Sequence, residues 1–125
     1  GAPRLSLIED LARALHEGSS EGALVAIRKA GEADVDMHLY LTLLLEYMRS
    51  VLLIRHAPEL RKELASELGE DLYGAMEKLA AANGSKLTHI TLKAFLDAAS
   101  RIRYAPIPAL ALELAVYELF GEEVA

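Results

Sequence analysis

Apolar residues recur at spacings of three and four along most of the chain, a pattern typical of amphipathic helices. In the first stretch, the charged residues lie opposite a stripe formed by Leu7, Ile8, Leu11, Ala14 and Leu15. Gly18 ends this stretch, and a serine just after it can cap a second helix from about Glu21 to Ala30, which Gly31 closes. The two segments predict a helical hairpin.

The third stretch, from about Val35 to His56, is apolar in almost every direction around the predicted helix. Asp34 or Asp36 can cap its start, and Pro58 ends it because the residue before a proline avoids the helical conformation. Its polar positions fall within an arc of about 80°; they are His38, Thr42, Glu46 and Arg49. A helix with so little polar surface must be surrounded, so we expect it at the centre of the fold.

Further helical stretches follow this central segment. A stripe of leucines runs from about Leu60 to Ala82, and Gly69 can divide it into two helices. After the turn Asn83-Gly84-Ser85, Ser85 or Thr88 can cap the next helix. That helix runs from about Leu87 to Tyr104, and Pro108 opens a last one from about Ala109 to Phe120. The pattern predicts an all-α fold, a compact bundle of six or seven helices.

The composition supports this prediction and limits the size of the fold. The chain has 24 Leu and 21 Ala against 5 Val and 6 Ile, a bias that favours helix over strand. Its 125 residues correspond to one domain. We expect residues 1–4 to be a cloning remnant or linker, and residues 5–125 to form a single helical domain. The absence of cysteine excludes disulfides and thiolate metal sites.

The charge balance argues against two classes of partner. With 13 basic and 19 acidic residues the net charge is −6, and no basic run exceeds two residues. Direct binding to nucleic acid is therefore not expected, since it normally needs a basic face. No uninterrupted apolar run reaches the roughly 18 to 20 residues of a membrane span, and the first residues do not resemble a signal peptide. We expect a cytoplasmic protein without membrane contact.

The sequence carries no motif for catalysis. Its four histidines, at positions 16, 38, 56 and 89, lack metal-ligand spacing. No serine has the glycine context of a nucleophile elbow. The segment from Gly18 to Gly22 follows a helix and lacks the Gly-Lys-Ser/Thr ending of a Walker loop, so it is a turn. We therefore predict neither an enzyme nor a bound cofactor or metal for this chain.

The last predicted helix is the most informative one. Its two charged residues, Glu113 and Glu118, lie about 140° apart around the helix axis. The arc between them carries Leu110, Leu114 and Tyr117. If this arc faces outward, these three residues with Glu118 form a candidate interface. If instead Glu113 is buried, it needs a cationic partner, for which Arg49 and Arg101 are the candidates. The sequence slightly favours the buried ion pair.

The segment from Ile102 to Ala115 resembles the end of the third domain of the gamma/tau subunit of bacterial DNA polymerase III. It contains that family's Pro-x-Leu-x-Leu-Glu-Leu-Ala pattern, starting at Pro108. The turn Gly31-Glu-Ala-Asp-Val-Asp36 and the following Leu44–Leu53 segment resemble the long helix of the same domain, with Met48 where the pattern usually has Leu. The resemblance covers the chain from about Leu5 to Phe120.

This resemblance implies a helical collar that packs against equivalent domains of neighbouring clamp-loader subunits. The implied partners are further gamma/tau copies, delta and delta prime. The ring of collars would hold the ATPase modules together while they load the sliding clamp in DNA replication. The family's ATP, magnesium and zinc sites belong to the two preceding domains, whose motifs do not occur here, so none is expected in this chain.

A second hypothesis, from a different class, is a small helical ligand-binding or regulatory domain. The long central segment would line its apolar pocket, with Tyr40, Tyr47 and Met48 as the candidate lining residues. Tyrosine and methionine on a central helix more often belong to core packing than to a ligand site.

Overall fold

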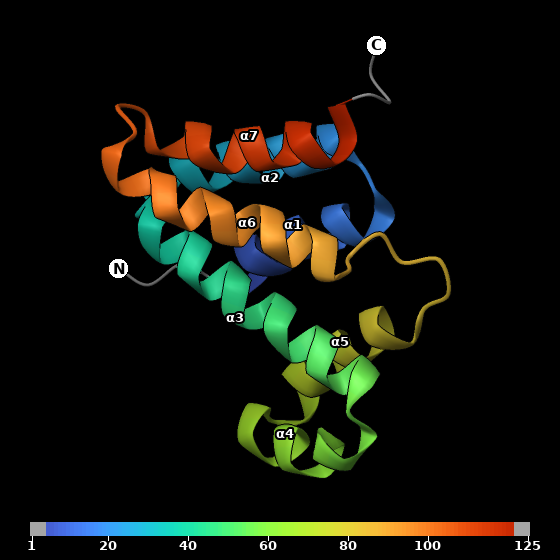
Figure 1. Ribbon diagram of the computed structural model, residues 1–125. Coiled ribbons are helices and arrows are strands. Elements are labelled where there is room, and N and C mark those ends of the chain that lie inside the picture. Colours follow the sequence, from blue (N-terminus) through green and yellow to red (C-terminus); the bar gives the residue numbers. More distant parts are fainter. Residues whose placement is uncertain (1–4, 122–125) are drawn as a thin grey trace.

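The long apolar helix α3 (Met37–His56) is the element around which the fold is built. In the computed structural model, which describes residues 5–121, α3 contacts every other α-helix of the described chain. Figure 1 shows it running obliquely past α1 (Leu5–Glu17) and α6 (His89–Arg101), with α2 (Ser20–Glu32) and α7 (Pro108–Phe120) side by side beyond them. Seven α-helices and no strand occur among these residues, so the all-α prediction is confirmed.

The buried side chains of α3 explain its central position. They face several neighbours at once and are Tyr40, Leu41, Leu44, Tyr47, Met48, Val51 and Ile54. The predicted polar arc is exposed. By length and composition α3 could also cross a membrane. Its packing against the other helices is instead that of a core helix.

The start of α3 and the end of α2 differ from the prediction by a few residues. Asp36 caps α3 by accepting a hydrogen bond from the Leu39 N–H (2.9 Å), so Val35 lies outside the helix. Helix α2 continues through Gly31 to Glu32. Asp34 takes the left-handed conformation that ends many helices (φ 58°), and the Val35 N–H reaches back to the Ala30 oxygen (3.2 Å). Asp34 thus closes the helix that Gly31 was expected to end.

Helices α4 (Arg61–Leu68) and α5 (Glu70–Ala81) cover the C-terminal half of α3. A short 3₁₀ turn, Pro58–Leu60, leads into α4. Gly69 separates the two helices with φ 89°, a value that favours glycine, so the leucine stripe is divided as the sequence allowed. None of the residues of α4 is buried, and together these helices form the lobe at the bottom of Figure 1.

Helix α6 is shorter at both ends than the predicted Leu87–Tyr104 segment. At its start, the Thr88 and Thr91 side chains form a reciprocal capping box. Beyond Arg101 the chain tightens into a 3₁₀ turn, Ile102–Tyr104, because Pro106 prevents continuation of the α-helix. Helix α7 begins at Pro108, one residue earlier than predicted.

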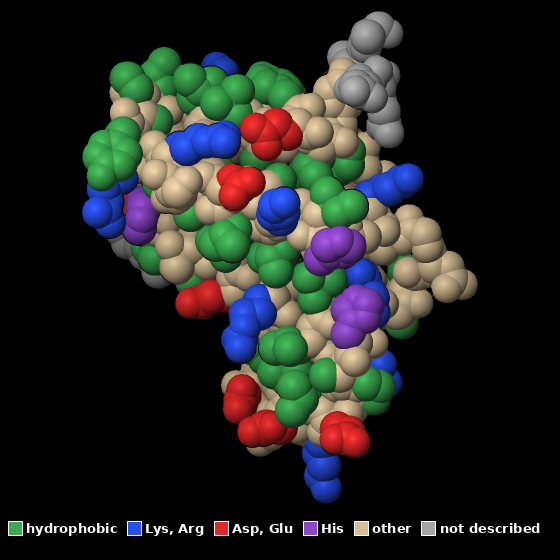
Figure 2. All heavy atoms as spheres, viewed as in Figure 1, with side chains coloured by type: hydrophobic (Ala, Val, Ile, Leu, Met, Phe, Trp, Pro, Cys, Tyr) green, Lys and Arg blue, Asp and Glu red, His purple; other side chains and the backbone are tan. Residues whose placement is uncertain are grey.

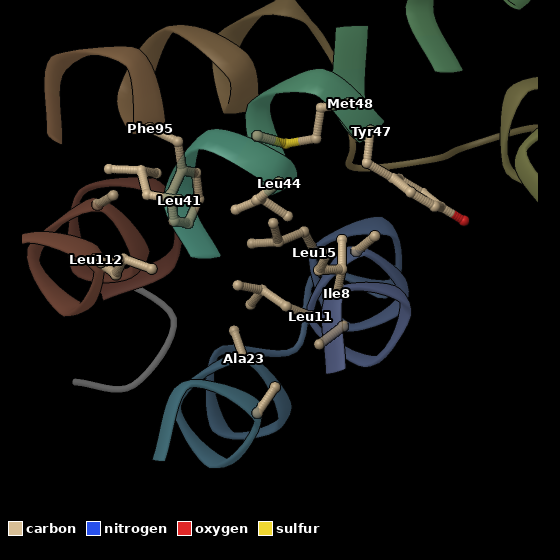
Figure 3. Close-up of a cluster of buried hydrophobic side chains, with 14 of the residues drawn as sticks. Ile8, Leu11, Leu15, Ala23, Leu41, Leu44, Tyr47, Met48, Phe95 and Leu112 are labelled. Atoms are coloured by element: carbon tan, nitrogen blue, oxygen red, sulfur yellow. The ribbon is translucent and has the colours of Figure 1, made fainter. Parts of the chain in front are cut away.

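The core is one continuous cluster to which most helices contribute. Figure 3 shows Leu11 and Leu15 of α1 beside Leu44 of α3, with Phe95 of α6 next to Leu41. Residues 1–4, expected to be a remnant or linker, lie outside the described residues, as do residues 122–125. The division of the chain at residue 5 stays a prediction.

Candidate interaction surface

Helix α7 presents its apolar arc to solvent. The side chains of its inner face are buried against α2, α3 and α6; they are Ala111, Leu112, Ala115, Val116 and Phe120. On the other face, Leu110 is 38% exposed, Leu114 40% and Tyr117 48%. Figure 2 shows hydrophobic side chains gathered along the edge that α7 occupies. We call Leu110, Leu114 and Tyr117 the α7 strip. Of the two arrangements left open by the sequence, the structure has the outward-facing arc.

The expected buried ion pair of Glu113 is therefore corrected. Glu113 is only partly buried, and no Arg or Lys side chain among residues 5–121 forms an ion pair with it. Arg101 lies beside Glu118 instead, with 3.4 Å between Nη1 and Oε1, and Arg49 is exposed on α3. Because Glu113 keeps contact with water, its charge does not need a buried partner. The exposed Arg101–Glu118 pair adds little stability.

A groove lies between α2 and α7, along one side of the α7 strip. It has a volume of about 1040 Å³, and one wall is formed by Ala109, Glu113 and Tyr117 of α7 with Gly121 just after the helix. The other wall is α2, which contributes Ser20, Glu21, Leu24, Val25, Ile27, Arg28, Gly31 and Glu32. The sequence analysis missed this groove. No pattern within α2 or α7 alone reveals it, because the groove exists only where the two helices pack side by side.

The residues of the alternative ligand pocket lie elsewhere. Tyr40, Tyr47 and Met48 are buried in the core, and none of them lines the groove between α2 and α7. The Tyr40 hydroxyl donates a hydrogen bond to the Leu7 carbonyl oxygen (2.9 Å), which ties α3 to α1. In Figure 3, Met48 lies above Leu44, within the cluster of buried side chains. These three side chains therefore serve packing, and their assignment to a pocket is corrected.

The burial of Tyr47 predicts a loss of stability at high pH. Burial, and to a lesser extent the charge of Glu9, raises the pKa of Tyr47 from 10 to about 12. The folded state thus favours the neutral phenol. Its contribution is complete below pH 10 and is lost as the pH rises through 12. Between about pH 9 and pH 11, Tyr47 should account for roughly 1 kcal/mol of lost unfolding free energy.

Urea unfolding of the wild type and of Tyr47→Phe at the two pH values measures this contribution. The wild type should lose more stability than the variant, because phenylalanine cannot ionise. Equal losses in the two proteins would mean that the Tyr47 hydroxyl is solvated in the folded state.

Five polar contacts that the sequence did not reveal, made by His16 and Arg55, fix the connection between α5 and α6. His16 Nδ1 lies 2.6 Å from Ser85 Oγ, and the Lys86 N–H donates to the His16 carbonyl oxygen (2.9 Å). The guanidinium group of Arg55 donates to the carbonyl oxygens of Leu79, Ala80 and Leu87. These contacts have a structural role. Within residues 5–121, His, Asp and Glu side chains form no group of three that could hold a metal.

The chain is similar to one family of known proteins. The family model described as DNA polymerase III subunits gamma and tau domain III matches residues 1–122. Neither the curated proteins nor the solved structures gave a match to the chain. The family match covers nearly the whole sequence, and the resemblance at Pro108 to Ala115 falls within it. The chain therefore belongs to the family of domain III of the DNA polymerase III gamma and tau subunits.

Proposed function

We propose that this domain is a collar that joins clamp-loader subunits through the α7 strip. Membership of the gamma and tau domain III family makes it a clamp-loader domain of DNA replication. In this proposal the domain is non-catalytic. The observation that carries the finer proposal is the outward position of Leu110, Leu114 and Tyr117 on one face of α7. A contiguous apolar strip bordered by Glu113 and Glu118 is typical of a protein interface.

The proposed partners are other gamma/tau copies, delta and delta prime. Covering one strip leucine completely in an interface would contribute about 1 kcal/mol, because roughly three-fifths of each is already buried in the domain. Several such contacts on each subunit would together stabilise a ring of collar domains. In this proposal the ATPase modules, with their ATP, magnesium and zinc, lie outside this chain. The collar works in the cytoplasm and touches neither DNA nor membrane.

Charge substitution in the α7 strip should weaken assembly without unfolding the domain. Leu110→Asp and Leu114→Asp place a carboxylate in the proposed interface, next to the existing glutamates. Each should raise the dissociation constant for self-association or for binding to the other clamp-loader subunits by about tenfold or more. Light scattering of the domain alone and mixed with those subunits measures the change, and circular dichroism checks the helices.

The matched control is Leu60→Asp. Leu60 is 36% exposed, close to the 38% of Leu110, but it lies in the 3₁₀ turn that leads into α4, and Figure 1 shows α4 at the end of the fold opposite α7. This variant should assemble like the wild type. A wild-type domain that stays monomeric and ignores the other subunits at tens of micromolar would refute the collar proposal, as would equal effects of Leu60→Asp and Leu110→Asp.

A further inference from the structure

We propose that the groove between α2 and α7 binds an amphipathic helix of a partner protein, in which lysine and arginine flank the apolar anchors. This binding site is distinct from the collar contact, because Leu110 and Leu114 do not line the groove. Tyr117 is the one residue of the α7 strip that also lines it. The proposal does not depend on collar assembly, and the two can be tested separately.

The shape of the groove fits a helix. Its walls, α2 and α7, have 13 residues each and run antiparallel, as the colours in Figure 1 show. Each wall is therefore about 18 Å long, whereas anchors at i, i+4 and i+7 of a bound helix span only about 10 Å. The floor is apolar, with Ile27 buried and Leu24 and Ala109 half-buried, and the exposed Val25 stands on the α2 side.

The charges around the groove select the chemistry of the partner. Four charged side chains line it, of which Glu21, Glu32 and Glu113 are acidic and Arg28 is basic. Arg28 lies beside Glu32, with 3.3 Å between Nε and Oε1. Glu21 and Glu113 stand on opposite walls and have no ion-pair partner among residues 5–121. A helix with basic residues on both sides of its apolar face would satisfy both carboxylates, while an acidic helix or nucleic acid would be repelled.

Gly31 leaves room for a close neighbour in the groove. It lies in the last turn of α2 and lines the groove, and a Cβ atom placed on it would meet no atom within 4 Å. Among residues 5–121, then, nothing requires glycine here, although glycine costs a helix about 0.5 to 1 kcal/mol relative to alanine. A bare backbone at this position lets a partner helix approach closely.

The first test is a binding measurement with two synthetic peptides. Both carry leucines at i, i+4 and i+7, one with flanking lysines and the other with flanking glutamates. Fluorescence anisotropy should show binding of the lysine peptide that is at least about tenfold tighter than binding of the glutamate peptide. The double variant Glu21→Lys, Glu113→Lys should reverse this preference. Equal binding of the two peptides, or binding of the apolar dye ANS alone, would overturn the proposal.

The second test fills the groove. Gly31→Leu should weaken binding of the lysine peptide by about tenfold or more, because its side chain occupies the space of the partner. Gly74→Leu is the matched control, since Gly74 is also helical and does not line the groove, and a Cβ atom placed on it would likewise meet no atom within 4 Å. Circular dichroism should show both variants folded. Undiminished binding to Gly31→Leu would overturn the proposal.

A cross-comparison separates this proposal from the collar proposal. Leu110→Asp should leave peptide binding unchanged, and Gly31→Leu should leave self-association unchanged. If the wild type neither self-associates nor binds the other clamp-loader subunits, but binds the lysine peptide, the collar proposal alone fails. If Gly31→Leu abolishes self-association and the wild type does not bind the peptide, the groove holds a second copy of the chain, and the present proposal is overturned.

Discussion

Replacing Arg55 by methionine should lower the free energy of unfolding by about 3 kcal/mol. Arg55 stands in the last turn of α3 and donates three hydrogen bonds to backbone carbonyl oxygens. Its Nε lies 2.9 Å from the Ala80 oxygen, its Nη1 2.8 Å from that of Leu87, and its Nη2 3.2 Å from that of Leu79. One side chain thus joins the end of α5 to the residue just before the cap of α6.

The expected loss of unfolding free energy follows from the hydrogen bonds that methionine cannot make. Methionine replaces the apolar stem of arginine but provides no donor, so three partly buried carbonyl groups lose their partner. Hydrogen bonds that involve a charged group contribute about 1.5 to 3 kcal/mol each, and water entering the site would recover part of that. The guanidinium group also lies at the C-terminal end of α3, where a positive charge is favourable.

Urea unfolding followed at the helical circular dichroism band measures the change. The control is Arg49→Met, because Arg49 is on the same helix but exposed, and it should change stability by less than about 0.5 kcal/mol. The loss of unfolding free energy for Arg55→Lys should lie between those of Arg55→Met and Arg49→Met, because an ammonium group lacks the planar fork of donors that a guanidinium group has. If Arg55→Met is as stable as Arg49→Met, water satisfies the three carbonyls.

The features that the sequence predicted correctly depend on local chemistry. Asp36 was one of two candidate caps, and Gly69 the candidate break, because capping and a positive φ are properties of a few neighbouring residues. The central position of α3 also followed from its own apolar surface. The end of α2 was predicted at the wrong residue. Gly31 and Asp34 are both residue types that can end a helix, and in the structure Asp34 takes the left-handed conformation while Gly31 stays helical.

The features that the sequence could not predict depend on contacts between distant segments. Arg55 meets carbonyl groups 24 to 32 residues away, at positions that no periodicity relates to it. The orientation of α7 also depends on contacts with segments far away in the sequence. Its sequence placed Glu113 at one border of the apolar arc, but whether that arc faces inward depends on where α2 and α6 pack. The groove between α2 and α7 likewise exists only once the two helices are side by side.

Replacing Phe95 by alanine should have the largest effect, a loss of about 4 kcal/mol of unfolding free energy. Phe95 is completely buried in α6, and Figure 3 shows its ring beside Leu41 of α3, on the side from which Leu112 of α7 approaches. Alanine would leave a cavity where three helices meet, and a packed core cannot close such a cavity fully. In a domain whose total stability is about 5 to 15 kcal/mol, this change removes a large share.

The neighbouring residue provides the control. Leu96 is 59% exposed, so Leu96→Ala removes a side chain of similar size from the same helix at a cost of less than about 0.5 kcal/mol. If Phe95→Ala does not fold, Phe95→Leu gives a measurable case, with an expected loss of about 1 to 1.5 kcal/mol. Thermal and urea unfolding measure all three variants. A loss for Phe95→Ala no larger than that for Leu96→Ala would mean that α6 does not anchor α7 to α3. In that case the outward position of the α7 strip would lose its support.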